Sequence, residues 1–244
     1  MATEILGESM IAKSLGEVLS RVAAATKRAG RAKPPRLVAV SKTKPKELLQ
    51  EAYDAGQRVF GENYVQELVE KAPELPDDIQ WHFIGHLQSN KANQILKKVP
   101  NLYAVETVDS TKIADALNRA VENAEWKRRL NVYVQVNTSA EESKFGVEPE
   151  GCVDLCTYVN SECSNLQFSG LMTIGMPDYT SRPENFQCLQ DCRAKVAAAL
   201  GVEEETLELS MGMSGDFEAA IESGSTNIRV GSTIFGARDY SNKK

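Results

Sequence analysis

Two kinds of segment alternate along this chain: short apolar runs rich in β-branched residues, and longer stretches with apolar residues at helical spacing. The repeat is about 25 residues, which is typical of one strand and one helix of a barrel. A helix is also predicted over residues 9–29, before the first apolar run. The predicted strands cover residues 37–42, 58–61, 81–85, 102–106, 131–136, 168–173, 206–210 and 227–235.

This alternation leaves two architectures, a closed (β/α)₈ barrel and an open doubly wound sheet. The open sheet usually carries a glycine-rich turn after its first strand. The turn here is Ser41-Lys42-Thr43-Lys44-Pro45, which contains no glycine. We therefore predict an α/β fold, a single TIM-type (β/α)₈ barrel with an extra N-terminal helix. One domain is expected over 1–244, with the helix at 9–29 and the barrel at 36–240.

Charge and hydropathy exclude several partners. The net charge of -6 gives no general attraction to nucleic acid or to an anionic membrane. No apolar run has the length of a membrane-spanning helix, and the N-terminal residues do not resemble a targeting signal. We expect a cytoplasmic monomer that binds neither nucleic acid nor membrane.

Cysteine and histidine spacings predict no metal site. The five cysteines show no CxxC pair, and we expect them to be free thiols. His82 and His86 have a spacing that converges on a helix, but here they fall on a strand and the turn after it.

In (β/α)₈ barrels the reacting groups lie at the carboxyl ends of the strands. Lys42 ends the first apolar run and would share a face with Val38 and Val40. On an inward face the apolar surroundings would lower the pKa of the lysine, as a Schiff-base lysine requires. The alternative is a solvated cation just past the strand, which is the commoner case for a strand-end lysine taken alone.

Small and hydroxyl residues follow the last two predicted strands. Ser210, Gly212 and Ser214 follow the seventh, and Gly231-Ser232 lies within the eighth. Barrels commonly bind phosphate with these two loops and a helix N-terminus, because small residues let backbone amides approach the anion. Ordinary turns use the same residues, so the prediction of a phosphate site depends on where these residues lie, after the seventh predicted strand and within the eighth.

Arg229 lies in the apolar stretch 228–235. It could form an ion pair with an acid such as Glu208 or Asp239, or face a ring nitrogen or an anion in the pocket. A lysine, a phosphate site and this arginine together suggest pyridoxal phosphate (PLP).

Five longer motifs resemble the pyridoxal phosphate homeostasis protein family, also known as the proline synthase co-transcribed family. The resemblance runs from the first helix to Tyr240 and implies a barrel like the N-terminal domain of alanine racemase. The motifs are VAVSKT (38–43), FGENYVQE (60–67), HFIGHLQSNK (82–91), LSMGMSGD (209–216) and RVGSTIFGAR (229–238).

The resemblance also implies roles for site residues. PLP would form a Schiff base with Lys42, and Asn63 would lie against the cofactor ring. Arg229 would face the pyridine nitrogen. The phosphate would be held by Ser210, Gly231 and Ser232, the last standing where many members carry threonine.

The chemistry favours a carrier over an enzyme. A cationic Arg229 disfavours a proton on the ring nitrogen, which makes PLP a poorer electron sink. Racemases with this arginine use a second base, a tyrosine from a further domain, which we expect to be missing here. We expect a PLP-binding protein in intracellular vitamin B6 homeostasis, which buffers PLP and delivers it to apo-enzymes without turnover. The alternatives are a racemase-like enzyme with Lys42 as its only base, and an aldolase-type barrel whose Lys42 binds a phosphorylated sugar.

Overall fold

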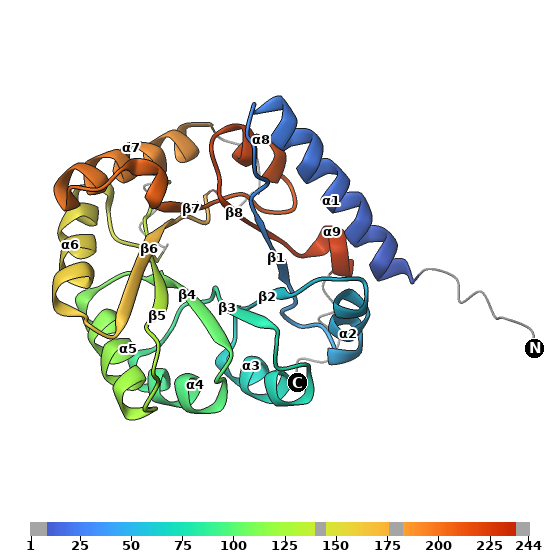
Figure 1. Ribbon diagram of the computed structural model, residues 1–244, viewed down its shortest axis with the longest axis horizontal. Helices are drawn as coiled ribbons and strands as arrows, with labels where there is room; N and C mark the ends of the chain where they lie inside the picture. Colours follow the sequence, from blue (N-terminus) through green and yellow to red (C-terminus); the bar gives the residue numbers. More distant parts are fainter. Residues whose placement is uncertain (1–8, 140–144, 176–182, 238–244) are drawn as a thin grey trace, which may run out of the picture.

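The computed structural model describes residues 9–139, 145–175 and 183–237. Eight parallel strands close into a barrel in chain order, and helices surround it (Figure 1). β1 (Arg36–Val40) pairs with both β2 (Val59–Glu62) and β8 (Asn227–Val230), which closes the sheet. The predicted (β/α)₈ barrel is therefore confirmed, and the open sheet is excluded.

The remaining strands are β3 (Gln80–Phe83), β4 (Leu102–Val108), β5 (Leu130–Gln135), β6 (Leu166–Met172) and β7 (Glu208–Ser210). The helices are α1 (Met10–Arg28), α2 (Lys46–Asp54), α3 (Val65–Lys71), α4 (Ala92–Lys98), α5 (Thr111–Asn123), α6 (Cys152–Glu162), α7 (Pro183–Leu200), α8 (Phe217–Glu222) and α9 (Ser232–Phe235). Short 3₁₀ turns lie at Ala72–Glu74, Ser89–Lys91, Pro149–Gly151 and Glu204–Thr206.

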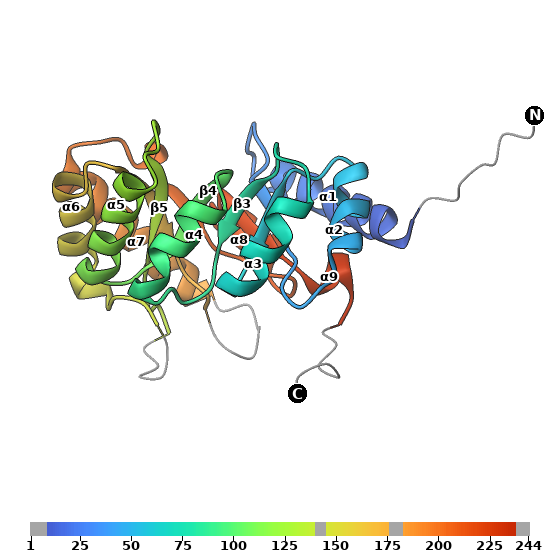
Figure 2. The same ribbon diagram turned by 90° about the horizontal axis from the view of Figure 1, so that it is seen from below.

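The main apolar core lies between the strands and the surrounding helices. In the side view α3, α4 and α5 lie in front of the strands and α7 and α8 behind them, with α1 and α2 at one end and α6 at the other, so the helices form one layer around the barrel (Figure 1 and Figure 2). The N-terminal helix belongs to the same layer, because Leu15 and Val18 of α1 are buried in the common core. Ser9 caps this helix by accepting a hydrogen bond from the Ala12 amide at 3.1 Å.

Five predicted strands end earlier than the sequence indicated: β3, β5 and β6 by one or two residues, and β1 and β8 where the chain turns away from the strand direction. β1 stops at Val40, and the chain then turns through Thr43 at φ +62°. β8 stops at Val230, and 232–235 form α9 instead of continuing the strand. A short apolar run has no periodicity that separates strand from helix. The hydrogen bonds from Ile234 and Phe235 to the Gly231 carbonyl close the helical turn.

None of the helices within the described ranges is long and apolar enough to cross a membrane. The cysteines are free thiols, four of them buried.

Candidate functional site

A cavity of about 580 Å³ opens where the barrel strands end. That volume suits a small-molecule ligand. Its wall comes from residues at or just past the carboxyl ends of β1, β2, β3, β6, β7 and β8. The lining residues are Val40, Lys42, Lys44, Asn63, Ile84, Met172, Ile174, Met213, Ser214, Gly215, Arg229, Gly231, Ser232, Thr233 and Gly236.

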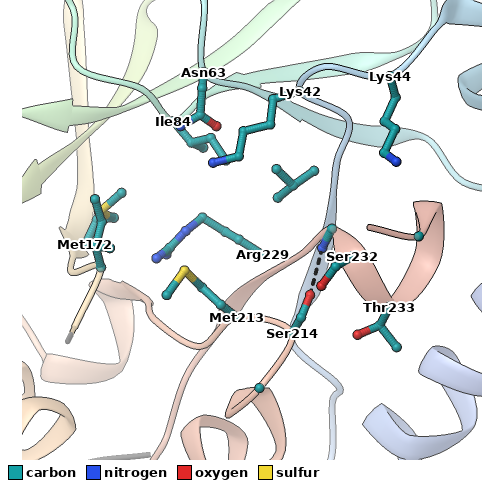
Figure 3. Close-up of a pocket in the computed structure, with 15 residues that line it drawn as sticks. Lys42, Lys44, Asn63, Ile84, Met172, Met213, Ser214, Arg229, Ser232 and Thr233 are labelled. Atoms are coloured by element: carbon teal, nitrogen blue, oxygen red, sulfur yellow. Dashed lines mark hydrogen bonds between the residues drawn. The ribbon is translucent and has the colours of Figure 1, made fainter. Parts of the chain in front are cut away.

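Lys42 reaches this cavity from a turn and not from the strand itself. Ser41, directly after β1, still donates its amide to the Gly61 carbonyl at 2.9 Å, and Lys44 then closes a turn on the Ser41 carbonyl at 3.1 Å. The partly buried Lys42 side chain points into the cavity above Arg229 (Figure 3). Val40 and Lys42 both line the cavity, although β1 ends at Val40 and Lys42 lies in the turn that follows.

Three side chains, which we call the lysine-turn cluster, hold this turn: Glu62 at the end of β2, and Glu67 and Lys71 in α3. Ser41 donates its hydroxyl to Glu62 at 2.7 Å, and Glu67 accepts the Thr43 amide at 2.8 Å. Lys71 donates to both glutamates at 2.8 Å and to the Ser41 carbonyl at 3.1 Å. Both neighbours of Lys42 in the chain are therefore bonded to one charged cluster.

Glu62 is fully buried. Burial raises its pKa to about 7, against the lowering effect of the Lys71 ammonium and the hydrogen bond from Ser41. A carboxyl group that titrates near neutral pH therefore supports the turn that carries Lys42.

Asn63 stands beside Lys42 on the cavity wall (Figure 3). Its carboxamide oxygen Oδ1 is buried and, among the described residues, has no hydrogen-bond partner. Gly85 packs on its backbone so closely that a Cβ there would lie 1.9 Å from the Asn63 carbonyl oxygen. A buried acceptor costs free energy unless a donor reaches it, so Asn63 fits a ligand that supplies one.

The opposite wall gathers hydroxyl and amide groups. The Gly231 amide donates to Ser214 Oγ at 3.1 Å, and Ser232 and Thr233 begin α9 beside them (Figure 3). The first N–H groups of a helix have no acceptor within that helix. A Cβ on Gly231 would lie 3.1 Å from the Val40 carbonyl oxygen, a tight contact, so glycine favours the close approach of the end of β8 to β1. These groups suit an anion.

Ser210, which the sequence placed among the phosphate ligands, does not line the cavity. It is fully buried, donates to Glu106 at 2.5 Å and accepts from Asn227 at 2.9 Å. As the last residue of β7 it points into the barrel interior. The loop that follows brings Ser214 to the wall instead, a serine that the sequence placed in the phosphate-binding loop but that the family resemblance did not name as a ligand.

Arg229 lines the cavity and is only 3% exposed. Its Nη1 donates to Ser210 Oγ at 2.6 Å and its Nη2 to the Thr173 carbonyl at 2.7 Å. Burial lowers its pKa, and the charge of Glu106, 4.0 Å away, partly offsets this.

The acid near Arg229 is not one that the sequence suggested. Glu208 pairs with Arg36 at 2.6 Å, and Asp239 lies outside the described residues. Glu106 in β4 takes that place. The one feature of the sequence that could have indicated Glu106 is that it is an acidic residue within the apolar run 102–108.

The two histidines lie in different surroundings. His82 is buried, with Nδ1 2.5 Å from Glu106, whereas His86 lies at the surface and stacks on Phe145. In the described parts of the chain, no group of three or more His, Cys, Asp or Glu side chains could hold a metal ion.

Comparison with known proteins gives consistent matches. The family model described as the N-terminal domain of alanine racemase matches residues 14–239. The chain is 48% identical to the human pyridoxal phosphate homeostasis protein, over 98% of this chain and 89% of the human one. It is 50% identical to the protein of the same name in Bos taurus, over 99% of this chain and 92% of that one.

A solved structure of the same size also matches. PipY of Synechococcus elongatus PCC7942, with PLP bound, has a TM-score of 0.70 and 33% sequence identity, covering 93% of this chain and 100% of PipY.

Proposed function

This chain belongs to the pyridoxal phosphate homeostasis protein family, and we propose that it binds pyridoxal 5′-phosphate as a Schiff base on Lys42. We further propose that it holds the cofactor for delivery to apo forms of PLP-dependent enzymes, without catalytic turnover. One observation carries the proposal: a lysine, a buried arginine and a group of hydroxyl and amide donors line one cavity of suitable volume.

The lining residues fit the parts of PLP. The cofactor supplies an aldehyde carbon that an amine can attack, and the Lys42 side chain enters the cavity. The unpartnered Oδ1 of Asn63 is available to a donor on the ligand. The phosphate would bind at the far wall to Gly231, Ser232 and Ser214, with Ser214 in the role expected of Ser210.

Arg229 supports storage over catalysis. A guanidinium keeps its proton near neutral pH. Its positive charge therefore disfavours a proton on a ring nitrogen that faces it. An unprotonated ring withdraws electrons weakly, so carbanions at the substrate are poorly stabilised. The same arginine still orients the ring.

The absorption spectrum of the purified protein tests the proposal. Protein loaded with PLP should show the band of a lysine Schiff base, and Lys42→Ala should abolish it. Lys44 also lines the cavity, so Lys44→Ala is the matched control and should keep the band. Borohydride reduction should leave one PLP mass adduct, on the peptide that contains Lys42. A missing adduct on that peptide refutes the proposal.

Two further measurements separate the alternatives. Activation of an apo-enzyme by the loaded protein, compared with free PLP, tests delivery. Exchange of the α-hydrogen of amino acids at enzymatic rates would favour a racemase-like enzyme. A protein that binds no PLP but traps a phosphorylated sugar on Lys42 with borohydride would favour the aldolase-type barrel.

A further inference from the structure

The barrel interior beneath the cavity contains a polar cluster, which we call the interior network: His82, Glu106, Ser210, Asn227 and Arg229. All five side chains are buried, none more than 3% exposed. Barrels of this type usually fill their interior with branched apolar side chains. Buried charges seldom add stability over apolar packing, so a network with three ionisable side chains calls for a role beyond stability.

The hydrogen bonds of this network define which atoms donate. A serine hydroxyl has one hydrogen and two acceptor sites. Arg229 Nη1 at 2.6 Å and Asn227 Nδ2 at 2.9 Å can only donate to Ser210 Oγ, and together they fill both acceptor sites. The Ser210 hydrogen must therefore point to Glu106 Oε2, 2.5 Å away.

Glu106 accepts from the other side as well. Its Oε1 accepts from Asn227 Nδ2 at 3.1 Å and lies 2.5 Å from His82 Nδ1. Burial alone would raise the pKa of Glu106, but the hydrogen bonds from His82 and Ser210 and the charges of His82 and Arg229 lower it overall. Glu106 is thus a carboxylate, and His82 Nδ1 is the donor to it.

We propose that Glu106 is a positioning residue for Arg229 and acts through Ser210. The proposal rests on the proposed function, because it gives Arg229 its place against the cofactor ring. Glu106 itself does not line the cavity. It orients the Ser210 hydroxyl so that a lone pair faces Nη1 of Arg229, and it balances the charge of the buried guanidinium.

This arrangement explains why Ser210 is a serine although it does not reach the cavity. Arg229 is held by two acceptors, the Thr173 carbonyl and the Ser210 hydroxyl. The carbonyl is part of the backbone, whereas the hydroxyl can rotate unless Glu106 accepts its hydrogen. Without the carboxylate, one of the two bonds that orient the guanidinium loses its direction.

The test replaces Glu106 by glutamine, which keeps the shape of the side chain and removes its charge. We expect the dissociation constant of PLP to rise about tenfold or more, the effect of losing one charge-assisted hydrogen bond. The pH midpoint of the Schiff-base band should also fall, because losing a buried negative charge in the barrel disfavours a positive charge on the Lys42 nitrogen. Glu106→Asp, which restores the charge, should recover part of both effects.

Glu208→Gln is the matched control, since Glu208 is a carboxylate on β7 that pairs with Arg36 and accepts from Tyr133. It should lower the melting temperature. The dissociation constant of PLP should stay within twofold of the wild-type value, and the pH midpoint of the Schiff-base band within a few tenths of a pH unit. If Glu106→Gln fails to fold, Ser210→Ala cuts the same link while keeping the charge, and PLP binding should again weaken.

A double-mutant cycle decides whether the effect passes through Arg229. In an Arg229→Gln background, Glu106→Gln should weaken PLP binding no further, because the residue it positions is gone. Additive losses, or a Glu106→Gln protein that binds PLP as tightly as wild type with an unchanged band midpoint, overturn the proposal. Failure of the proposed function would give a different result, because wild-type protein would then show no Schiff-base band and no PLP adduct on Lys42.

Discussion

Two fully buried glutamates lie beside the cavity, and their pKa values move in opposite directions. Glu106 belongs to the interior network and its pKa is lowered, whereas Glu62 belongs to the lysine-turn cluster and its pKa is raised to about 7. Burial raises both. The partners differ: both oxygens of Glu106 accept hydrogen bonds, while Oε2 of Glu62 is buried and has no partner among the described residues.

At equal burial, the two pKa values therefore follow the surroundings of each carboxyl group, namely the donors that reach its oxygens and the charges nearby. Glu62 also lies near a second carboxylate, Glu67, which raises its pKa further. The arginine end of the cavity is therefore supported by a carboxylate that is charged at neutral pH. The lysine end is supported by a group whose charge changes close to neutral pH.

The largest expected effect is on stability when Glu106 is removed. Glu106→Ala leaves Arg229 buried without its counter-charge, and breaking a buried pair in this way costs about 3–5 kcal/mol. Glu62→Ala should cost less, because Lys71 is partly exposed and keeps Glu67 as a partner. The free energy of unfolding in urea at pH 7 measures both. Equal losses of unfolding free energy in the two variants would contradict the expected difference between Glu106 and Glu62.

The next effect is a pH dependence of stability that comes from Glu62. Its folded pKa of about 7 lies above the unfolded value of 4.5, so the native state binds more protons between these values. Its contribution to stability is complete below the unfolded pKa and is lost as the pH rises through about 7, a change of about 3 kcal/mol at most.

Melting temperatures from pH 5 to 8 test this prediction, and Glu62→Gln should flatten the decline. Glu106 has the opposite sign: its lowered pKa adds stability above the unfolded pKa, which is lost as the pH falls through the folded value. Glu106→Gln should therefore leave the slope between pH 5 and 8 in place. A Glu62→Gln protein with the wild-type slope would show that another group titrates there.

Lys71→Met should have a smaller effect that depends on pH. It removes the cation that lowers the pKa of Glu62, and the donor to the Ser41 carbonyl. We expect a loss of about 1–3 kcal/mol at pH 8, where Glu62 is charged, and less at pH 5, where it is neutral. Lys71→Arg, which keeps the charge, is the control. An equal loss at both pH values would assign the effect to packing alone.

Glu67→Gln should have the smallest effect, below about 1 kcal/mol, because the Glu67 side chain is 27% exposed and partly exposed ion pairs contribute little. The glutamine oxygen can still accept the Thr43 amide. Thermal unfolding at pH 7 measures the change. A loss as large as that of Glu62→Ala would mean that the lysine-turn cluster behaves as one unit.

The site was predictable where residues lie directly after strand ends. Lys42, Asn63, Gly231 and Ser232 all line the cavity, and so does Arg229. Ser210 was misplaced because the last residue of β7 still points into the barrel interior, where Glu106 and Arg229 bind it, and the loop has to run further before Ser214 reaches the cavity wall. Glu106 was not predicted as a support, because Ser210 and Asn227 come from segments more than 100 residues away, and the contacts of Glu62 with Ser41 and Lys71 depend on how the turn after β1 packs against α3.

The sequence by itself determined the barrel, because hydrophobic periodicity is a local property and eight alternations leave few ways to bury every strand. It also determined which residue types gather at the strand ends. Only the tertiary structure decided where β1 and β8 stop, that Ser214 and not Ser210 lines the cavity, and which glutamate keeps its charge. These outcomes depend on contacts between segments that only the closed barrel brings together, so no single segment contains them.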